Sequence, residues 1–285
     1  MIGRMPTFTA SDGTELAYHV RGEGPPLIAL PGGPMVASEY LGDLGGLSAH
    51  RTLILLDLRG TGDSATPADP ATYRCDRQVD DVEALRAHLA LDRVDLLAHS
   101  AAGNLALLYA ARHSDRVSSL ALIAVTPRAL GLHATDEDHL TAAQLRAGED
   151  WFEEAYANLK AVQAGESALS LEAVGGFIYG RWDAAARAHL ALMESLTNDE
   201  ASDLFHTPAA YDPPATLAAL ARLDAPVLLL CGEHDGAPDP GLTHRAADLL
   251  PRTEVAVQPG AGHIPWIDDA DWFVRRVNTF LRSAE

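Results

Sequence analysis

The sequence has 285 residues, of which 47% are apolar and 21% charged, a composition typical of one globular domain with an elaboration and unlike that of disordered chains. Its formal net charge of −19 repels phosphate backbones and anionic lipids, so neither nucleic acid nor a membrane surface is an expected partner. The apolar runs are far shorter than the roughly 20 residues that cross a bilayer, and the N-terminus lacks a basic-then-apolar signal. We therefore expect a cytoplasmic protein without a membrane span.

The two cysteines, Cys75 and Cys231, are too few for a disulfide framework. Cys231 closes an apolar run, where a thiol packs as a small hydrophobe. We expect no metal site and no redox role for either cysteine.

Strand and helix patterns alternate over the first 127 residues. Short apolar or alternating runs predict strands at 15–21, 27–30, 52–57, 94–98 and 117–125. Helical spacing of apolar residues predicts helices at 76–91 and 103–112. Continuous apolar strands of this kind are typical of a parallel sheet that is covered on both faces.

The alternation stops between residues 128 and 212, where the pattern is helical, rich in Ala and acidic residues, with one ambiguous strand candidate at 177–179. It resumes with helices at 214–222, 241–250 and 271–281 and strands at 227–231 and 254–257. We predict one α/β domain formed by residues 1–127 and 213–285, interrupted by a helical cap at 128–212. The pattern says nothing about the oligomeric state.

Ser100 is the candidate nucleophile, because the strand 94–98 runs through it directly into a helix. A tight strand-to-helix turn requires small residues two before and two after the serine, and this chain has Ala98 and Ala102 there. Unlike glycine, alanine at a positive φ costs about 1 kcal/mol or more. We therefore expect the two alanines to weaken the turn. His99, beside the serine, is expected to pack or to form structural hydrogen bonds.

A serine hydroxyl is a poor nucleophile until an imidazole accepts its proton. His263, in a glycine-rich loop after the last predicted strand, is the candidate base, and Asp235, after the strand 227–231, is the candidate carboxylate that orients it. Two alternatives stay open at this point. His234 competes for the role of base, and Asp239 competes for that of the acid.

Residues 31–34 (Pro-Gly-Gly-Pro) form a bare loop of the kind that offers backbone N–H groups to a developing oxyanion. Residues 57–64 (DLRGTGDS) fit no phosphate loop, because no G-K-[ST] follows. Both segments follow predicted strands, as the serine, the histidine and the aspartate do. Polar groups that follow parallel strands gather at one edge of a sheet.

Residues 98–102 (AHSAA) resemble the G-x-S-x-G nucleophile elbow of the α/β-hydrolase family, and the chain order Ser100, Asp235, His263 is the order of that family. Residues 31–34 are similar to its H-G-G-P loop, and residues 57–64 to its D-x-R-G-x-G-x-S loop, which is structural. The resemblance implies an α/β-hydrolase fold, a mostly parallel sheet flanked by helices with an inserted helical cap. It also implies a Ser-His-Asp triad, oxyanion donors at the N–H groups of Gly33 and Ala101, and no cofactor.

The Gly-Gly-Pro loop and the helical cap look most like the prolyl aminopeptidase group, which implies removal of an aminoacyl group from a small peptide or metabolite through an acyl-enzyme. In that group acidic cap residues bind the substrate amine, and this cap offers several carboxylates: Glu153, Glu154, Glu172, Glu194 and Glu200. A carboxylesterase or lactonase, with an apolar cap pocket, is the alternative. A non-hydrolytic or ligand-binding relative is a further one. Trp266 is a candidate either for the pocket or for the core.

Overall fold

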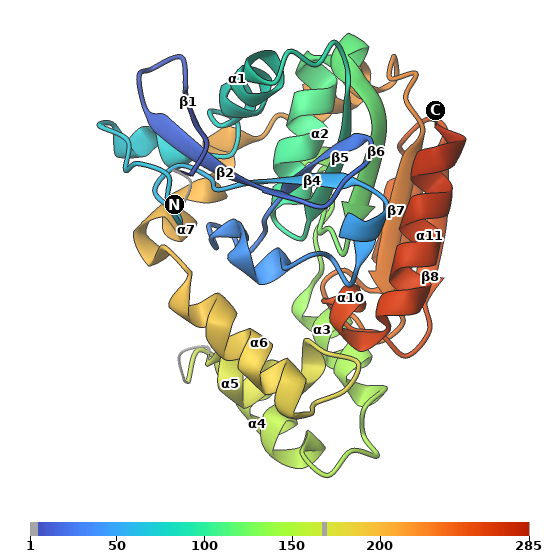
Figure 1. The fold of residues 1–285 in the computed structure, drawn as a ribbon. Coiled ribbons are helices and arrows are strands. Elements are labelled where there is room, and N and C mark those ends of the chain that lie inside the picture. Colours follow the sequence, from blue (N-terminus) through green and yellow to red (C-terminus); the bar gives the residue numbers. More distant parts are fainter. Residues whose placement is uncertain (1–4, 167–169, 285) are drawn as a thin grey trace.

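The computed structural model describes residues 5–166 and 170–284, and within them eight strands form one twisted sheet (Figure 1). Their order across the sheet is β1-β2-β4-β3-β5-β6-β7-β8. Strand β2 pairs antiparallel with β1 and β4, whereas all pairs from β4 to β8 are parallel. The strands are β1 (Thr7–Thr9), β2 (Glu15–Arg21), β3 (Pro26–Leu30), β4 (Thr52–Leu56), β5 (Val94–His99), β6 (Val117–Ile123), β7 (Val227–Gly232) and β8 (Thr253–Gln258).

The sheet is buried on both faces because its strands carry apolar residues at successive positions. In β3, Leu27 and Ala29 join the core cluster on one face, while Ile28 joins the cluster on the other. Side chains alternate between faces along a strand, so an uninterrupted apolar run supplies both cores at once. The parallel sheet that was predicted from these runs is confirmed.

Helices cover each face of the sheet. Those that contribute to the core of one face are α1 (Val79–His88), α2 (Ala102–Arg112), α8 (Pro213–Leu220) and α9 (Pro240–Ala247). The other face is covered by α10 (Pro265–Asp268) and α11 (Ala270–Ser283). Phe273, Val277 and Phe280 of α11 recur at helical spacing and are buried against the sheet.

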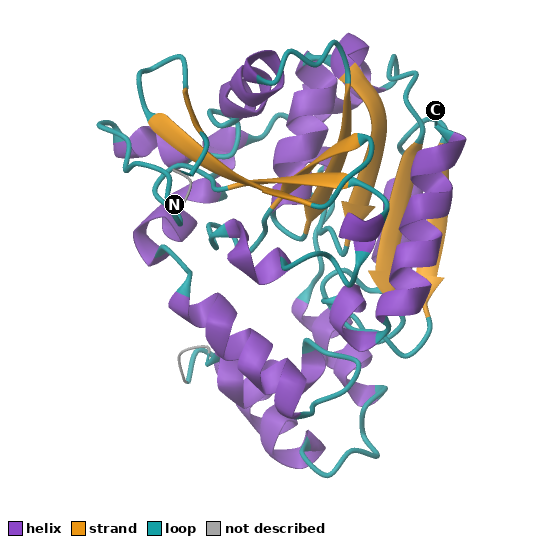
Figure 2. Cartoon of the chain, viewed as in Figure 1, coloured by secondary structure: helices purple, strands orange, loops and turns teal. Residues whose placement is uncertain are grey.

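The segment between β6 and α8 is helical, and its described residues contain no strand (Figure 2). Its α-helices are α3 (Asp136–Gln144), α4 (Phe152–Gln163), α5 (Leu171–Val174), α6 (Ala184–Ser195) and α7 (Asp199–Phe205). The strand candidate at 177–179 is wrong, because Phe177 ends a 3-10 turn, Gly175–Phe177, and a turn at Ile178 and a bend at Tyr179 follow. We keep the name cap for residues 128–212, whose division from the core stays a prediction.

Most expected element boundaries lie within two residues of those observed, and those that differ by three are the two ends of α1 and the C-terminal end of α9. Strand β6 ends two residues early because Ala124 adopts a positive φ of 51°. Helix α1 begins at Val79 rather than at residue 76, after a turn in which the side chain of Gln78 donates to the carbonyl oxygen of Tyr73. The three-residue edge strand β1 was missed, since so short a run carries no periodicity.

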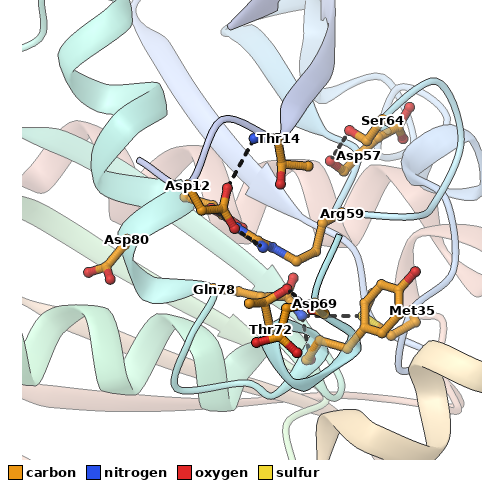
Figure 3. Close-up of polar contacts among 12 residues, drawn as sticks. Asp12, Thr14, Met35, Asp57, Arg59, Ser64, Asp69, Thr72, Gln78 and Asp80 are labelled. Carbon is orange, nitrogen blue, oxygen red and sulfur yellow. Dashed lines mark hydrogen bonds and ion pairs between the residues drawn. The ribbon is translucent and has the colours of Figure 1, made fainter. Parts of the chain in front are cut away.

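The 57–64 loop is built around two buried charged groups. The carboxylate of Asp57 accepts from the N–H and hydroxyl of Ser38, at 2.8 and 2.7 Å. The guanidinium of Arg59, only 3% exposed, pairs with Asp81 and with Asp12, the second contact being drawn in Figure 3. These contacts join the 57–64 loop to neighbouring segments of the core, which agrees with the structural role expected of this loop.

Within the described ranges, no helix combines the length and the apolar character needed to span a bilayer.

Candidate active site

Ser100 lies at the turn between β5 and α2, and its backbone is left-handed, with a φ of 53°. Few residues other than glycine adopt this conformation, and it recurs where a fold holds a functional side chain under strain. The N–H of Ser100 donates to the carbonyl oxygen of Ile123 at 2.8 Å, which fixes the turn against β6. The side chain of Ser100 faces a cavity beneath the cap.

The two alanines of the turn are not strained, contrary to expectation. Ala98 lies inside β5 and Ala102 is the first residue of α2; both are fully buried, and neither has a positive φ. Glycine is required instead at Gly103, where a Cβ would lie 2.3 Å from both γ-carbons of Val125. The expectation was wrong because the positive φ of this turn falls on the serine itself.

The structure brings the three predicted residues together. The Oγ of Ser100 lies 2.8 Å from Nε2 of His263, and Nδ1 of His263 lies 2.9 Å from Oδ2 of Asp235. Asp235 is buried, and its other oxygen accepts the N–H of Ala237 at 2.9 Å. Burial alone would lower the pKa of His263, but the charge of Asp235 and its hydrogen bond outweigh burial and raise that pKa above 6.5.

The structure places Asp239, the alternative acid, and His234, the alternative base, in different contacts. Asp239 is the N-cap of α9, where its Oδ1 accepts the N–H of Leu242 at 3.0 Å. His234 lines the cavity, but the hydrogen-bond partner of the Ser100 hydroxyl is His263. The geometry therefore favours Asp235 and His263 over these alternatives.

The N–H groups of Gly33 and Ala101 have no acceptor among the described residues. Gly33 lines the cavity and adopts a φ of 116°, a conformation that only glycine tolerates well. Ala101 is the N-cap residue of α2, where the helix dipole favours a negative charge. Two free donors beside the serine are what an oxyanion requires.

The cavity next to Ser100 has a volume of about 340 Å³ and a largely apolar wall. The cap supplies most of that wall, from α3, α4, α5, α6 and the turn before α6: Ala142, Ala143, Leu159, Leu171, Val174, Phe177, Ile178, Leu190 and Met193. The cap also contributes one polar lining residue, His139 of α3, while the other polar lining side chains come from the core: His99, Ser100, His234, Asp235 and His263. Asp235 is the one carboxylate among the described lining residues, and it is engaged with His263.

The five cap carboxylates considered for amine binding lie elsewhere. All of them are exposed, and none is among the described residues that line the cavity: Glu153, Glu154, Glu172, Glu194 and Glu200. Glu154 and Glu172 line a separate hollow, together with Trp151 and Trp182. Trp266 is 3% exposed and belongs to the core, so of its two candidate roles the structure supports packing.

One group of described side chains has the composition of a metal site. Ligand atoms of His19, Asp57 and Asp63 lie within 4.8 Å of one another. The carboxylate of Asp57 already accepts hydrogen bonds from His19, from the N–H of Asp63 and from Ser38. Its lone pairs are thus engaged by protein donors, and we assign this carboxylate to the support of the 57–64 loop.

Comparison with known proteins agrees with this arrangement. The family model described as the alpha/beta hydrolase fold matches residues 25–270. The chain belongs to the α/β-hydrolase family. This match and the mostly parallel eight-stranded sheet confirm the predicted fold class.

Among its relatives, the hydrolase is 25% identical over 272 residues to a proline iminopeptidase of Heyndrickxia coagulans, covering 93% of each chain. It is 27% identical over 289 residues to a putative 2-succinyl-6-hydroxy-2,4-cyclohexadiene-1-carboxylate synthase of Bacillus subtilis (strain 168), covering 96% of this chain and 97% of that protein. The crystal structure of esterase RhEst1 from Rhodococcus sp. ECU1013 matches with a TM-score of 0.74 at 24% identity, covering 99% of this chain and 100% of that one. The last likeness shows the fold alone.

Two side chains that the sequence did not single out fix the cap segment beside the His263 loop of the hydrolase, Arg146 from within the cap and Asp268 from α10. Arg146, 4% exposed, donates to the carbonyl oxygens of Tyr179 and Gly180, at 2.7 and 3.0 Å. Asp268 accepts the N–H groups of Gly180 and Gly262, at 2.9 and 2.8 Å. No local signal reveals these contacts, because the partners of Arg146 and Asp268 in the cap are 33 and 88 residues away along the chain.

Proposed function

We propose that the enzyme hydrolyses carboxylic esters that carry a small apolar acyl group, with Ser100 as nucleophile. The observation that carries this proposal is the apolar cavity of about 340 Å³ that opens on the Ser100 hydroxyl. An acyl chain in that cavity gains about 0.8 kcal/mol for each buried CH₂ group. The described residues that line the cavity offer no free carboxylate to a cationic substrate group.

Acylation follows from the geometry. The Ser100 hydroxyl donates its proton to Nε2 of His263 while its oxygen attacks the ester carbonyl carbon. Asp235 holds the ring by its Nδ1–H and stabilises the imidazolium that forms. The N–H groups of Gly33 and Ala101 bind the oxyanion, and the imidazolium then protonates the departing alkoxide, which leaves as the alcohol.

Deacylation repeats these steps with water as the nucleophile. His263, neutral again, removes a proton from water as the water oxygen attacks the acyl-enzyme carbonyl carbon. Collapse of the second tetrahedral intermediate breaks the bond to Ser100, whose oxygen recovers the proton from His263. The carboxylic acid leaves, and the cycle needs no redox partner.

Hydrolysis of aminoacyl amides is the second candidate, because several relatives bear the name proline iminopeptidase. The group that such enzymes release carries a protonated amine. In this cavity the amine would meet an apolar wall, and a buried charge without a partner costs several kcal/mol. The composition of the cavity therefore favours the ester over the aminoacyl substrate.

A matched pair of substrates separates the two candidates. The isobutyryl and L-alanyl groups have nearly the same shape and differ by a methyl in place of the ammonium, so each is offered as its p-nitrophenyl ester and its p-nitroanilide. We expect kcat/KM for the isobutyryl ester to exceed that for the alanyl ester by at least about 100-fold, the factor that an unpaired buried charge imposes. Ser100→Ala supplies the background rate.

Covalent labelling of Ser100 tests the mechanism independently of substrate turnover. Intact mass after exposure to a fluorophosphonate should show one adduct on the wild type and none on Ser100→Ala. Faster release from the alanyl substrates would overturn the ester assignment in favour of an aminopeptidase. A folded wild type that forms no adduct and releases no nitrophenol would overturn the serine mechanism itself.

A further inference from the structure

His99 and Tyr40 form a buried hydrogen-bonded bridge that the mechanism above does not use. Nε2 of His99 lies 2.9 Å from the carbonyl oxygen of His263, and its Nδ1 lies 2.8 Å from the hydroxyl of Tyr40. That hydroxyl accepts the N–H of Gly32 at 2.6 Å. The bridge thus runs from the Gly-Gly loop to the backbone of the candidate base.

With a neutral His99 ring, only one arrangement of protons satisfies all of these contacts. A carbonyl oxygen can only accept, so Nε2 of His99 carries the hydrogen and donates it to His263. Nδ1 of a neutral ring is then an acceptor, and it takes the hydroxyl proton of Tyr40. The oxygen of Tyr40 is left free to accept the N–H of Gly32. Every donor therefore points along the bridge from Gly32 to the His99 ring, and from the ring on to His263.

The surroundings of the bridge keep it in this state. His99 is fully buried and Tyr40 is 2% exposed. Burial, and then the positive charge that His263 acquires, lower the pKa of His99 well below 6.5, so its ring stays neutral. Trp266 packs edge-on against the His99 ring, with ring centres 4.8 Å apart.

Tyr40 is itself held from the cap. Nε2 of His189, on α6, lies 2.9 Å from the carbonyl oxygen of Tyr40, and the two rings meet edge to face at 6.0 Å. Nδ1 of the same histidine lies 2.8 Å from the hydroxyl of Tyr179. The bridge is therefore anchored at a point that does not depend on the Ser100 turn.

Two hydrogen bonds hold the Gly-Gly loop at Gly32, one from its N–H to the Tyr40 hydroxyl and one to its carbonyl oxygen from the N–H of Val36 at 3.2 Å. Gly32 passes so close to the turn that a Cβ would lie 2.8 Å from the Cβ of Ser100 and 2.7 Å from the carbonyl oxygen of His99. Gly33, next to it, has a φ of 116° and no side chain to restrain it. A displacement of about 1 Å in such a group can cost 100-fold in rate.

We propose that His99 and Tyr40 are positioning residues that fix the oxyanion loop and the His263 loop relative to each other. Tyr40 holds Gly32, and with it the adjacent N–H of Gly33. His99 joins Tyr40 to the backbone of His263. The inference rests on the proposed function, because it assigns a role in the serine mechanism to groups that touch no substrate.

Two substitutions of His99 separate the halves of the bridge. Asparagine places an acceptor near the position of Nδ1, so His99→Asn retains the contact with Tyr40 and loses the one with His263. Glutamine places a donor near the position of Nε2, so His99→Gln does the reverse. Tyr40→Phe removes the hydroxyl alone. Tyr109→Phe is the matched control, since Tyr109 is also fully buried and donates to Glu83, remote from the site.

The readouts are kcat per fluorophosphonate-reactive site and KM, both for the isobutyryl ester, and the affinity for an alkyl boronic acid, which forms a tetrahedral adduct with an activated serine. We expect Tyr40→Phe and His99→Gln to lower kcat and boronic acid affinity by about 10- to 100-fold, the scale of a displaced oxyanion donor, with KM within about threefold. His99→Asn keeps Gly32 in place but frees the backbone of His263, so it should retain most of the boronic acid affinity while its kcat falls by about 10-fold or more. Tyr109→Phe should match the wild type.

A purely structural role predicts a different pattern, in which the variants lose reactive sites or melt earlier while the remaining sites keep wild-type kcat and boronic acid affinity. That result would overturn the positioning role and leave the proposed function standing. A folded wild type that neither reacts with the fluorophosphonate nor binds the boronic acid would overturn both.

Discussion

Replacing Ala98 and Ala102 by the glycines of the usual elbow motif should destabilise this protein. In Ala98→Gly and Ala102→Gly, the strand or helix gains a residue whose backbone entropy disfavours folding by about 0.5–1 kcal/mol. Each change also removes a fully buried methyl group, worth about 0.8 kcal/mol. We therefore expect each variant to lose about 1–2 kcal/mol of unfolding free energy, with no gain in the reactivity of Ser100.

Gly103→Ala is the informative counterpart, because helix propensity predicts that it increases the free energy of unfolding, whereas packing predicts that it decreases it. Propensity alone favours alanine in a helix by about 0.8–1 kcal/mol. The new Cβ, however, would lie 2.3 Å from both γ-carbons of Val125, and overpacking of this kind costs about 1–3 kcal/mol. We expect net destabilisation, relieved in part by Val125→Ala, which removes those two carbons.

Urea unfolding gives the free energies, and the rate of fluorophosphonate labelling reports the geometry of the Ser100 turn. The reasoning is refuted if Ala98→Gly or Ala102→Gly is more stable than the wild type or labels faster. It is also refuted if Gly103→Ala is stabilising, because the close contact with Val125 would then carry no energy.

Three further predictions follow from the site. The wild-type kcat/KM should fall as the pH drops through a pKa above 6.5, because protonated His263 cannot accept the Ser100 proton; a pH–rate profile with an acid limb centred below 6.5 would contradict the assigned pairing. Asp235→Asn should lower kcat by about 10⁴-fold, as in other triads, and move that limb to lower pH, since burial of His263 then acts unopposed. Asp239→Asn, which keeps the helix cap, is its control in the same kinetic assay and should stay within about threefold of the wild type. Asp268→Ala should cost about 1–3 kcal/mol in urea unfolding, because the N–H groups of Gly180 and Gly262 lose their acceptor; an unchanged midpoint and slope would show that Asp268 does not hold the cap.

Much of the core could be predicted from the sequence, because its signals are local. Apolar runs of strand length, helical spacing and the loops that follow the strands are properties of neighbouring residues. They placed Ser100, Asp235 and His263 each after a strand of one parallel sheet, whose carboxyl ends meet at one edge. The prediction that these residues converge on one site follows from that topology.

The backbone conformation of the Ser100 turn was harder to predict from the sequence. The motif suggested that strain would fall on Ala98 and Ala102, whereas the positive φ belongs to Ser100 and the close contact to Gly103. The demand for glycine at position 103 depends on the side chain of Val125, which follows β6, and nothing in residues 98–103 encodes that contact.

The sequence alone determined the fold, the order of the chemical groups and the acidic surface. The tertiary structure decided which carboxylate faces His263, and that the cap turns apolar residues to the cavity while its glutamates stay outside. It also revealed the bridge of His99 and Tyr40, whose members lie 59 residues apart along the chain. Such pairings arise from the packing of elements that are distant in the chain. Sequence patterns indicate only which face of each element is buried and how neighbouring residues interact.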